Sequence, residues 1–303
     1  MRKITNEFMK ELKEGKFKVL IEEIKKDNTL DTELRGDKVI VYYRGGKLLT
    51  IYHDKETIEV NNSYKTNCED KTEIIGIEEC LNRIPLVKYD MDKYLSEKMN
   101  LEKEFQQLIV RENNYSKISD STDYYIADME YNEKTSEGRF DLIGFKWESK
   151  GSARKNPKNV KLVLFEIKYG KDAIKSVGNN PGLKTHLEDF DKTISDEKIF
   201  CGLADDISEV VKQKAELGLI KGNKGIDGKY NFSGITISHE KPEVVFILIN
   251  YDYESTMLKE ELNNITKNYD FPIYFAQSSY MGYGLYFDKF IKFDDMKAKL
   301  NNQ

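Results

Sequence analysis

The chain has 303 residues, of which 39% are hydrophobic and 12% aromatic, so it can bury a sizeable core without disulfide or metal staples. Charged residues make up 33% of the sequence, but the two signs are interleaved and the net charge is only −5, which excludes a polybasic, histone-like binder. A nucleic-acid enzyme is not excluded, because such proteins often confine their basic residues to one face.

The cysteine pattern and the apolar runs bear on the compartment. The three cysteines, Cys68, Cys80 and Cys201, are far apart and form no C-x-x-C pair, which disfavours a disulfide framework or a zinc site. The N-terminus has no apolar leader, and the longest apolar run, Val244 to Ile249, is too short to span a bilayer. We therefore expect a soluble, cytoplasmic protein with no membrane partner.

The first 90 residues predict a small α+β unit. Apolar residues at helical spacing over 5–27 indicate one or two helices. Two β-branched and aromatic runs then flank Gly45-Gly46, which is a hairpin signal, and a further strand is expected from Thr57 to Val60. Residues 1–91 are interpreted as an accessory domain that carries no identifiable chemistry. Substrate choice and dimerisation are the two roles left open for it.

The remaining residues, 92–303, predict an α/β domain. Strands alternate with helices, and one strand is apolar along its whole length, which is typical of a mixed, partly parallel central sheet flanked by helices. The expected helices cover 92–112, 183–195, 206–218 and 254–267, and the expected strands cover Tyr124–Tyr131, Arg139–Trp147, Val160–Ile167 and the segments PEVVFILIN, PIYFAQ and GLYFDKF.

Two of these strands carry a carboxylate and lysine constellation. Asp141 lies in the strand pattern GRFDLIGF, and Glu166 and Lys168 end the apolar strand KLVLFEIKYG. At a period of two, Glu166 and Lys168 point to one face of the sheet and Ile167 to the other. If the two strands are neighbours, Asp141 can approach the face that carries Glu166 and Lys168.

Such a set is what phosphodiester hydrolysis requires. Carboxylates bind a hard cation such as Mg²⁺ or Mn²⁺, which keeps several waters and takes one or two protein carboxylates. The cation neutralises phosphate charge and helps to generate hydroxide, while a nearby lysine orients the attacking water. The backbone carbonyl of Ile167 is a further candidate ligand. The alternative interpretation is that Glu166 and Lys168 form a solvated pair on a strand edge.

The order of these motifs resembles the PD-(D/E)XK superfamily of restriction-endonuclease-like nucleases. A helix with glutamate, LEKEFQQLI, precedes the strand with Asp141, the strand with Glu166-x-Lys168 and a further helix, over about residues 95–200. The resemblance implies a restriction-endonuclease-like core, with Asp141 and Glu166 as metal ligands and Lys168 as the catalytic lysine. Arg139-Phe140 stands where the family pattern has proline, and a long insertion separates the two strand motifs.

The helical glutamate that the resemblance implies is Glu102 or Glu104. The two residues flank the apolar stripe of the helix on opposite sides. The spacing E-x-x-F-Q favours Glu102, and an ordinary solvated position remains the alternative for both.

Basic residues near the motifs indicate a nucleic-acid partner. Residues 146–175 contain nine basic and three acidic side chains, and the insertion WESKGSARKNPKN reads as a flexible basic loop beside the proposed site. Its alternative is a solvated hairpin tip. Lys184 and His186, in the helix after the Glu166 strand, could support the site or contact the phosphate backbone. The expected phosphate contacts are Arg154, Lys155, Lys158, Lys171, Lys184 and His186.

The sequence therefore predicts a metal-dependent nuclease that cuts nucleic acid, with DNA favoured over RNA. The resemblance to the nuclease superfamily implies a role in defence or repair, and a homodimer is compatible with the sequence. Two alternatives remain open: a catalytically silent nucleic-acid-binding protein on the same fold, and a protein-interaction module whose carboxylates are surface charges. The aromatic tail YMGYGLYFDKF can stack on bases, but its strand spacing favours a core position.

Overall fold

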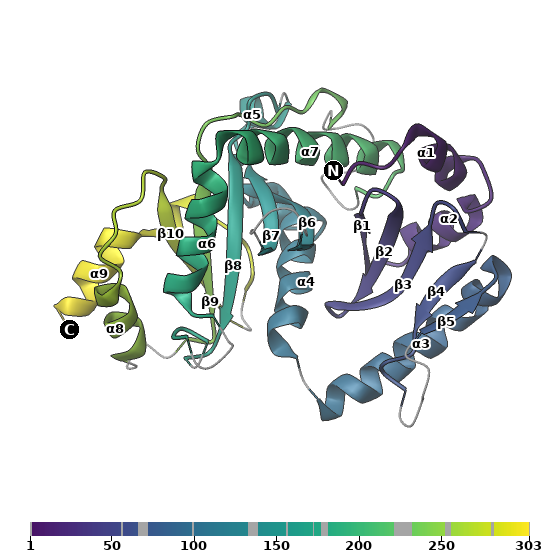
Figure 1. The fold of residues 1–303 in the computed structure, drawn as a ribbon, viewed down its shortest axis with the longest axis horizontal. Helices are drawn as coiled ribbons and strands as arrows, with labels where there is room; N and C mark the ends of the chain where they lie inside the picture. Colours follow the sequence, from purple (N-terminus) through teal and green to yellow (C-terminus); the bar gives the residue numbers. More distant parts are fainter. Residues whose placement is uncertain are drawn as a thin grey trace.

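The computed structural model describes residues 2–302 except 56, 66–71, 99, 133–138, 156, 172, 177–180, 221–231, 252–255 and 280–281. It is an α/β protein with two sheets, one of five strands and one of six, each covered by its own helices (Figure 1). Within the described ranges, none of the helices is both long and apolar enough to cross a bilayer.

The N-terminal unit is an antiparallel five-stranded meander packed on three helices. Its strands follow the chain order β1-β2-β3-β4-β5, and their inner faces bury aliphatic side chains against the helices. The elements are α1 (Asn6–Lys13), α2 (Lys18–Lys26), β1 (Leu30–Leu34), β2 (Lys38–Tyr43), β3 (Gly46–Tyr52), β4 (Ile58–Asn61), β5 (Thr72–Ile75) and α3 (Ile77–Glu97).

The second unit is built on a mixed sheet of order β11-β10-β9-β8-β7-β6. The β6-β7-β8 meander is antiparallel, β9 and β10 run parallel to β8, and β11 closes the far edge antiparallel. The elements are α4 (Leu101–Asn114), β6 (Tyr124–Asn132), β7 (Arg139–Lys146), α5 (Gly151–Lys155), β8 (Leu162–Tyr169), α6 (Leu183–Ser195), α7 (Glu197–Glu216), β9 (Glu243–Ile249), α8 (Thr256–Asn264), β10 (Ile273–Ser278), β11 (Ile291–Lys292) and α9 (Phe293–Asn301).

The second sheet is buried on both faces. Along β8, Val163, Phe165 and Ile167 pack in the core under α4, whereas Leu162 and Leu164 pack in the core under α6 and α7. Every residue of β9 is buried, which explains its unbroken apolar run. The predicted α/β class with a central sheet between helices and a smaller N-terminal α+β unit is confirmed at this level.

The helices that follow residue 91 differ from the predicted one. A single helix was expected over 92–112, but α3 continues through 91 and 92 to Glu97, and α4 starts separately at Leu101. Asn100 caps α4, because its side-chain oxygen accepts a hydrogen bond from the Lys103 N–H. The position predicted as the end of the first unit, residue 91, therefore lies inside α3.

The predicted hairpin is confirmed: β2 and β3 pair antiparallel around a turn of Arg44 and Gly45, both at positive φ, and Gly46 already belongs to β3. One further local prediction was wrong. The segment GLYFDKF is not a strand: Phe287–Lys289 form a 3₁₀ turn, followed by the short β11 and by α9, which the pattern did not reveal. Strands β1 and β5 were also not anticipated.

The two units are joined by a buried group of charges, here called the interdomain cluster. Its members are three cations and three carboxylates drawn from the N-terminus, β1 and the turn after it, β6 and α7: Arg2, Glu33, Arg35, Asp128, Asp206 and Lys214. Arg35 and Arg2 both pair with Asp128, at 2.8 and 3.2 Å, and Lys214 pairs with Glu33 at 2.7 Å. The Asp206 carboxylate accepts a hydrogen bond from the Arg2 backbone N–H at 2.6 Å.

Candidate active site

The two strand motifs lie on adjacent strands of the six-stranded sheet. The ladder between β7 and β8 runs from Phe145↔Leu162 to Leu142↔Phe165. Beyond that pair, the Ile167 N–H donates to Asp141 Oδ2 at 2.8 Å. The Asp141 side chain thus binds the main chain of β8 at the position between Glu166 and Lys168.

Glu166 and Lys168 form a buried ion pair. Lys168 Nζ lies 2.8 Å from Glu166 Oε1, and the two side chains are only 6% and 4% exposed. Lys168 Nζ also reaches the Pro181 carbonyl oxygen at 3.4 Å. Because β9 pairs in parallel beside Glu166 and Lys168, both residues are fixed by main-chain hydrogen bonds on that side.

His186 completes the contacts of Glu166. Its Nε2 lies 2.8 Å from Glu166 Oε1, the same oxygen that Lys168 contacts. Leu187 and Phe190, in the next turn of α6, are fully buried and hold the helix against the sheet. The sequence left two roles open for His186, support of the site and contact with the phosphate backbone, and this contact with Glu166 agrees with the first.

The two candidate glutamates of α4 point in different directions. Glu102 lines the cavity that Asp141, Glu166 and Lys168 also line. Glu104 faces the N-terminal unit, where its carboxylate accepts hydrogen bonds from Arg44 at 2.9 and 3.1 Å. The geometry thus separates the pair and leaves Glu102 as the glutamate that shares the site.

Three carboxylates therefore meet one lysine and one histidine. Burial raises the pKa of the Asp141 carboxyl well above its usual range, and the negative charge of Glu166 adds to the effect. Burial likewise raises the pKa of Glu102, partly opposed by Lys168. Burial alone would raise the pKa of Glu166, but the hydrogen bond from His186 and the charge of Lys168 outweigh it and lower that pKa.

These groups open onto a cavity of about 530 Å³. Polar side chains dominate its wall, and the charged ones come from α4, β7, β8 and the segment between β8 and α6. The residues that line it are Asn100, Glu102, Arg139, Asp141, Glu166, Lys168, Tyr169, Ala173, Lys175, Pro181 and His186. The cavity can hold a small polar or anionic group directly against the carboxylates.

A divalent cation fits the chemistry of this donor set. Within the described part of the chain, no three His, Cys, Asp or Glu side chains gather as a metal-binding group. Mg²⁺ commonly takes only one or two protein carboxylates and keeps its waters. Asp141 and Glu166 supply such a pair. Burial, together with the negative charge of Glu166, raises the pKa of Asp141, and a bound cation would offset this cost of ionisation.

Two site residues were missed by the sequence interpretation. Gln106, almost fully buried, donates through Nε2 to Asp141 Oδ1 at 2.9 Å. Its spacing of four residues from Glu102 places both side chains on one face of α4, and this signal was available in the sequence. Glu130 of β6 has a left-handed φ of 57°, which is costly for a residue other than glycine, and its charge contributes to the raised pKa of Glu102.

The basic insertion does not lie beside the site. It connects the end of β7 at Lys146 with the start of β8 at Leu162, whereas Asp141 and Lys168 occupy the opposite ends of these strands (Figure 1). The part at 151–155 is the short helix α5, and Lys155 and Lys158 are exposed at this far end.

Arg154 requires a separate correction. It was expected to contact phosphate, but its side chain is buried, with the guanidinium 4.6 Å from the Trp147 ring and hydrogen-bonded to the Thr122 carbonyl. Arg154 therefore anchors α5 to the sheet. Lys171 and Lys184, by contrast, are exposed after β8 and in the first turn of α6, at the end of the sheet that carries the site.

The three cysteines were expected to form neither a disulfide framework nor a zinc site. Cys80 is buried and Cys201 partly buried, both as free thiols, while Cys68 lies outside the described residues.

Comparison with protein-family models, with curated proteins and with solved structures gives no match. The argument for function therefore depends on the site itself.

Proposed function

We propose that this chain is a metal-dependent nuclease that hydrolyses phosphodiester bonds in nucleic acid, with DNA as the preferred substrate and Mg²⁺ or Mn²⁺ as cofactor. One observation carries the proposal. Asp141 and Glu166, on adjacent strands, share one cavity with Glu102, and Lys168 stands 2.8 Å from Glu166. Two carboxylates for a cation and an ammonium group beside them are the components of phosphodiester hydrolysis.

The order of the elements supports the same proposal. Helix α4 precedes the antiparallel meander β6-β7-β8, and β9 returns parallel to β8 after α6 and α7. This order agrees with the restriction-endonuclease-like core that the motif order suggested, with Asp141 on the second strand of the meander and Glu166-x-Lys168 on the third. The fold argument remains an analogy, and the site carries the chemistry.

Each residue has a defined role in the proposed reaction. Asp141 and Glu166 would hold the cation, with the Ile167 carbonyl as an added ligand, and the bound cation would neutralise the phosphate and acidify a water. Lys168 donates a hydrogen bond to the attacking water and stabilises negative charge that develops on the phosphate. His186 keeps Glu166 ionised, and Gln106 and the Ile167 N–H orient Asp141.

The test is cleavage of supercoiled, linear and single-stranded DNA, and of RNA, by the full-length protein with Mg²⁺, with Mn²⁺ and with EDTA. We expect cleavage with either metal and none with EDTA. Lys168→Ala should be inactive, whereas Lys161→Ala, which removes a lysine just before the start of β8, should cut normally.

Two results would reject the proposal. The wild-type protein could leave every substrate intact in both metals, in which case the silent binding module is the better description. Alternatively, Lys168→Ala could cut as well as wild type, which would make the lysine a partner of Glu166 with no role in the reaction.

A further inference from the structure

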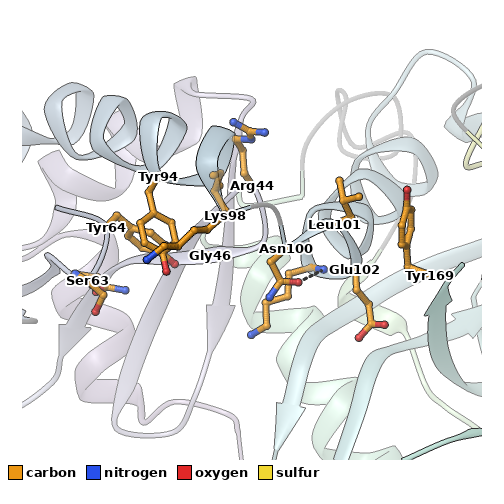
Figure 2. Close-up of a pocket in the computed structure, with 13 residues that line it drawn as sticks. Arg44, Gly46, Ser63, Tyr64, Tyr94, Lys98, Asn100, Leu101, Glu102 and Tyr169 are labelled. Carbon is orange, nitrogen blue, oxygen red and sulfur yellow. Dashed lines mark hydrogen bonds between the residues drawn. The ribbon is translucent and has the colours of Figure 1, made fainter. Parts of the chain in front are cut away.

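A second cavity lies between the N-terminal unit and α4 and has a volume of about 780 Å³, within the range of ligand-binding sites (Figure 2). Its walls come from the β2–β3 hairpin, the segment after β4, the C-terminal end of α3 and the first turn of α4. The lining residues are Arg44, Gly46, Asn61, Ser63, Tyr64, Tyr94, Leu95, Lys98, Asn100, Leu101, Glu102, Lys103 and Tyr169.

This cavity adjoins the candidate active site. Asn100, Glu102 and Tyr169 line both cavities. Figure 2 shows Glu102 and Tyr169 on one side of the cavity and Tyr64, Tyr94 and Lys98 on the other. A ligand in this cavity would therefore lie next to the residues of the candidate active site.

The walls combine cations with aromatic rings. The lining cations are Arg44, Lys98 and Lys103. Arg44 pairs with Asp92 and Glu104, and Lys103 Nζ lies 3.4 Å from a carboxylate oxygen of Glu130. Among the described residues, Glu102 at the junction with the candidate active site is the one carboxylate that lines the cavity. The Tyr64 and Tyr94 rings meet edge to face at a centroid distance of 5.3 Å, and Lys98 Nζ lies 5.3 Å from the Tyr94 ring. Cations that follow a backbone and aromatic rings that stack on bases are the features by which proteins bind single-stranded nucleic acid.

The cavity is preorganised by close packing of the hairpin on α4. A Cβ atom on Gly45 would lie 2.0 Å from the Lys103 carbonyl oxygen, so only glycine allows this approach. The Gly45 N–H donates to Gln107 Oε1 at 2.6 Å. Arg44 is held by Glu104 and Asp92, so the hairpin residues of the wall are fixed before any ligand arrives.

We propose that this interdomain cavity binds a short single-stranded segment of the nucleic acid that flanks the scissile phosphate. The inference extends the proposed nuclease function by assigning the N-terminal unit to substrate binding. Lys98 contacts a phosphate, and Tyr94, with Tyr64 behind it, stacks on a base. A duplex cannot stack a base on these rings without unpairing, so the subsite selects single strands, overhangs or opened ends.

The test measures binding of a fluorescein-labelled oligodeoxythymidylate of about 12 nucleotides by anisotropy, with full-length protein in EDTA. Tyr94→Leu should weaken binding about tenfold, because it removes a stacking surface. Lys98→Ala should weaken binding severalfold and reduce the slope of log K against log salt by about 0.7. The matched control is Lys93→Ala, an exposed lysine of the same helix that does not line the cavity.

The outcomes separate the subsite from the nuclease. Wild-type affinity in both Tyr94→Leu and Lys98→Ala, at unchanged melting temperature, would overturn the subsite, as would absence of oligonucleotide binding by the wild type. Metal-dependent cleavage alongside either result would leave the nuclease standing. Conversely, the wild type could bind the oligonucleotide more tightly than Lys98→Ala and yet cut no substrate. That result would support the subsite and reject the nuclease. An equal loss of affinity for a duplex of the same length in Tyr94→Leu would contradict single-strand selection.

Discussion

The interdomain cluster and the candidate active site are both buried groups of charges, but they are composed differently. The interdomain cluster has three cations for three carboxylates, and Asp128 at its centre is fully buried. The candidate active site gathers Asp141, Glu166 and Glu102 around Lys168 and His186, and it opens onto a cavity that Arg139 and Lys175 also line. A balanced, closed group is what a structural junction requires, whereas clustered carboxylates that face a cavity leave a place for a cation.

The largest expected contrast comes from removing one lysine from each group. Lys168→Ala should reduce cleavage at least about 10²–10³-fold and change the free energy of unfolding by no more than about 1–2 kcal/mol, because His186 still contacts Glu166 and the cavity admits water. Lys214→Ala should destabilise the protein by about 3–5 kcal/mol, because Glu33 loses its 2.7 Å partner inside the protein. Urea denaturation and a cleavage assay measure both variants.

The expected difference would be contradicted if Lys168→Ala lowered the free energy of unfolding as much as Lys214→Ala does. In that case the Lys168–Glu166 pair would be a structural ion pair, and the comparison between a junction and a reaction site would lose its basis.

The second expected effect is a pH dependence that belongs to the interdomain cluster. Burial and the charge of Asp128 raise the pKa of Glu33 from 4.5 to about 7, against the opposing charges of Lys214 and Arg35. Because the folded protein binds this proton more tightly than the unfolded chain, the stabilisation is complete below about pH 4.5 and is lost as the pH rises through about 7.

Glu33→Gln removes this titration. Between these pH values the free energy of unfolding of the wild type should therefore fall relative to that of Glu33→Gln by roughly 3 kcal/mol, since one pKa unit corresponds to about 1.4 kcal/mol. If the difference in free energy of unfolding between the two proteins were the same at every pH, Glu33 would keep an ordinary pKa in the folded protein.

Much of the fold follows from local patterns, while the buried charges do not. The runs at β6, β7, β8 and β9 read as strands because their apolar content reflects burial between helices. Strand β1, LDTEL, is buried along its full length yet contains Asp31 and Glu33. Their partners Tyr115 and Lys214 lie 84 and 181 residues further along the chain, so no local pattern could mark them as interior.

In the candidate site, too, local relations could be predicted from the sequence and contacts between distant segments could not. The strand period placed Glu166 and Lys168 on one face, as the structure has them, because that relation is local. The position of the basic insertion at the far end of β7 and β8 also follows from hairpin connectivity, since a β7–β8 loop must lie opposite Asp141 and Lys168. That inference was available and was not drawn. The contact of Arg44 with Glu104, by contrast, depends on how the two units dock.

The third prediction compares the two glutamates on α4. Glu102→Ala should reduce cleavage about 10- to 100-fold, because Glu102 lines the cavity beside Lys168 and Glu166. Glu104→Ala should leave cleavage near the wild-type rate and cost about 1 kcal/mol of stability or less, because it removes a partly exposed partner of Arg44. Cleavage rates under single-turnover conditions and thermal denaturation distinguish the two. A larger loss of activity in Glu104→Ala would transfer the helical carboxylate role to that residue.

The smallest expected effect is a gain in stability when the site loses a carboxylate. In Asp141→Asn, the side-chain oxygen can still accept the Ile167 N–H. The new amide replaces the oxygen that accepts from Gln106 Nε2, so it can donate to Gln106 Oε1 once the Gln106 amide turns over. Removing one of the clustered negative charges relieves repulsion with Glu166, so without metal the variant should be more stable than wild type by about 1 kcal/mol at pH 7. Mg²⁺ should stabilise the wild type and not the variant, and this difference is measured by thermal denaturation with and without the metal. Equal stabilisation of both proteins by Mg²⁺ would remove Asp141 from the metal site, and a less stable variant would show that the Asp141 charge is compensated within the fold, as it is for Asp128.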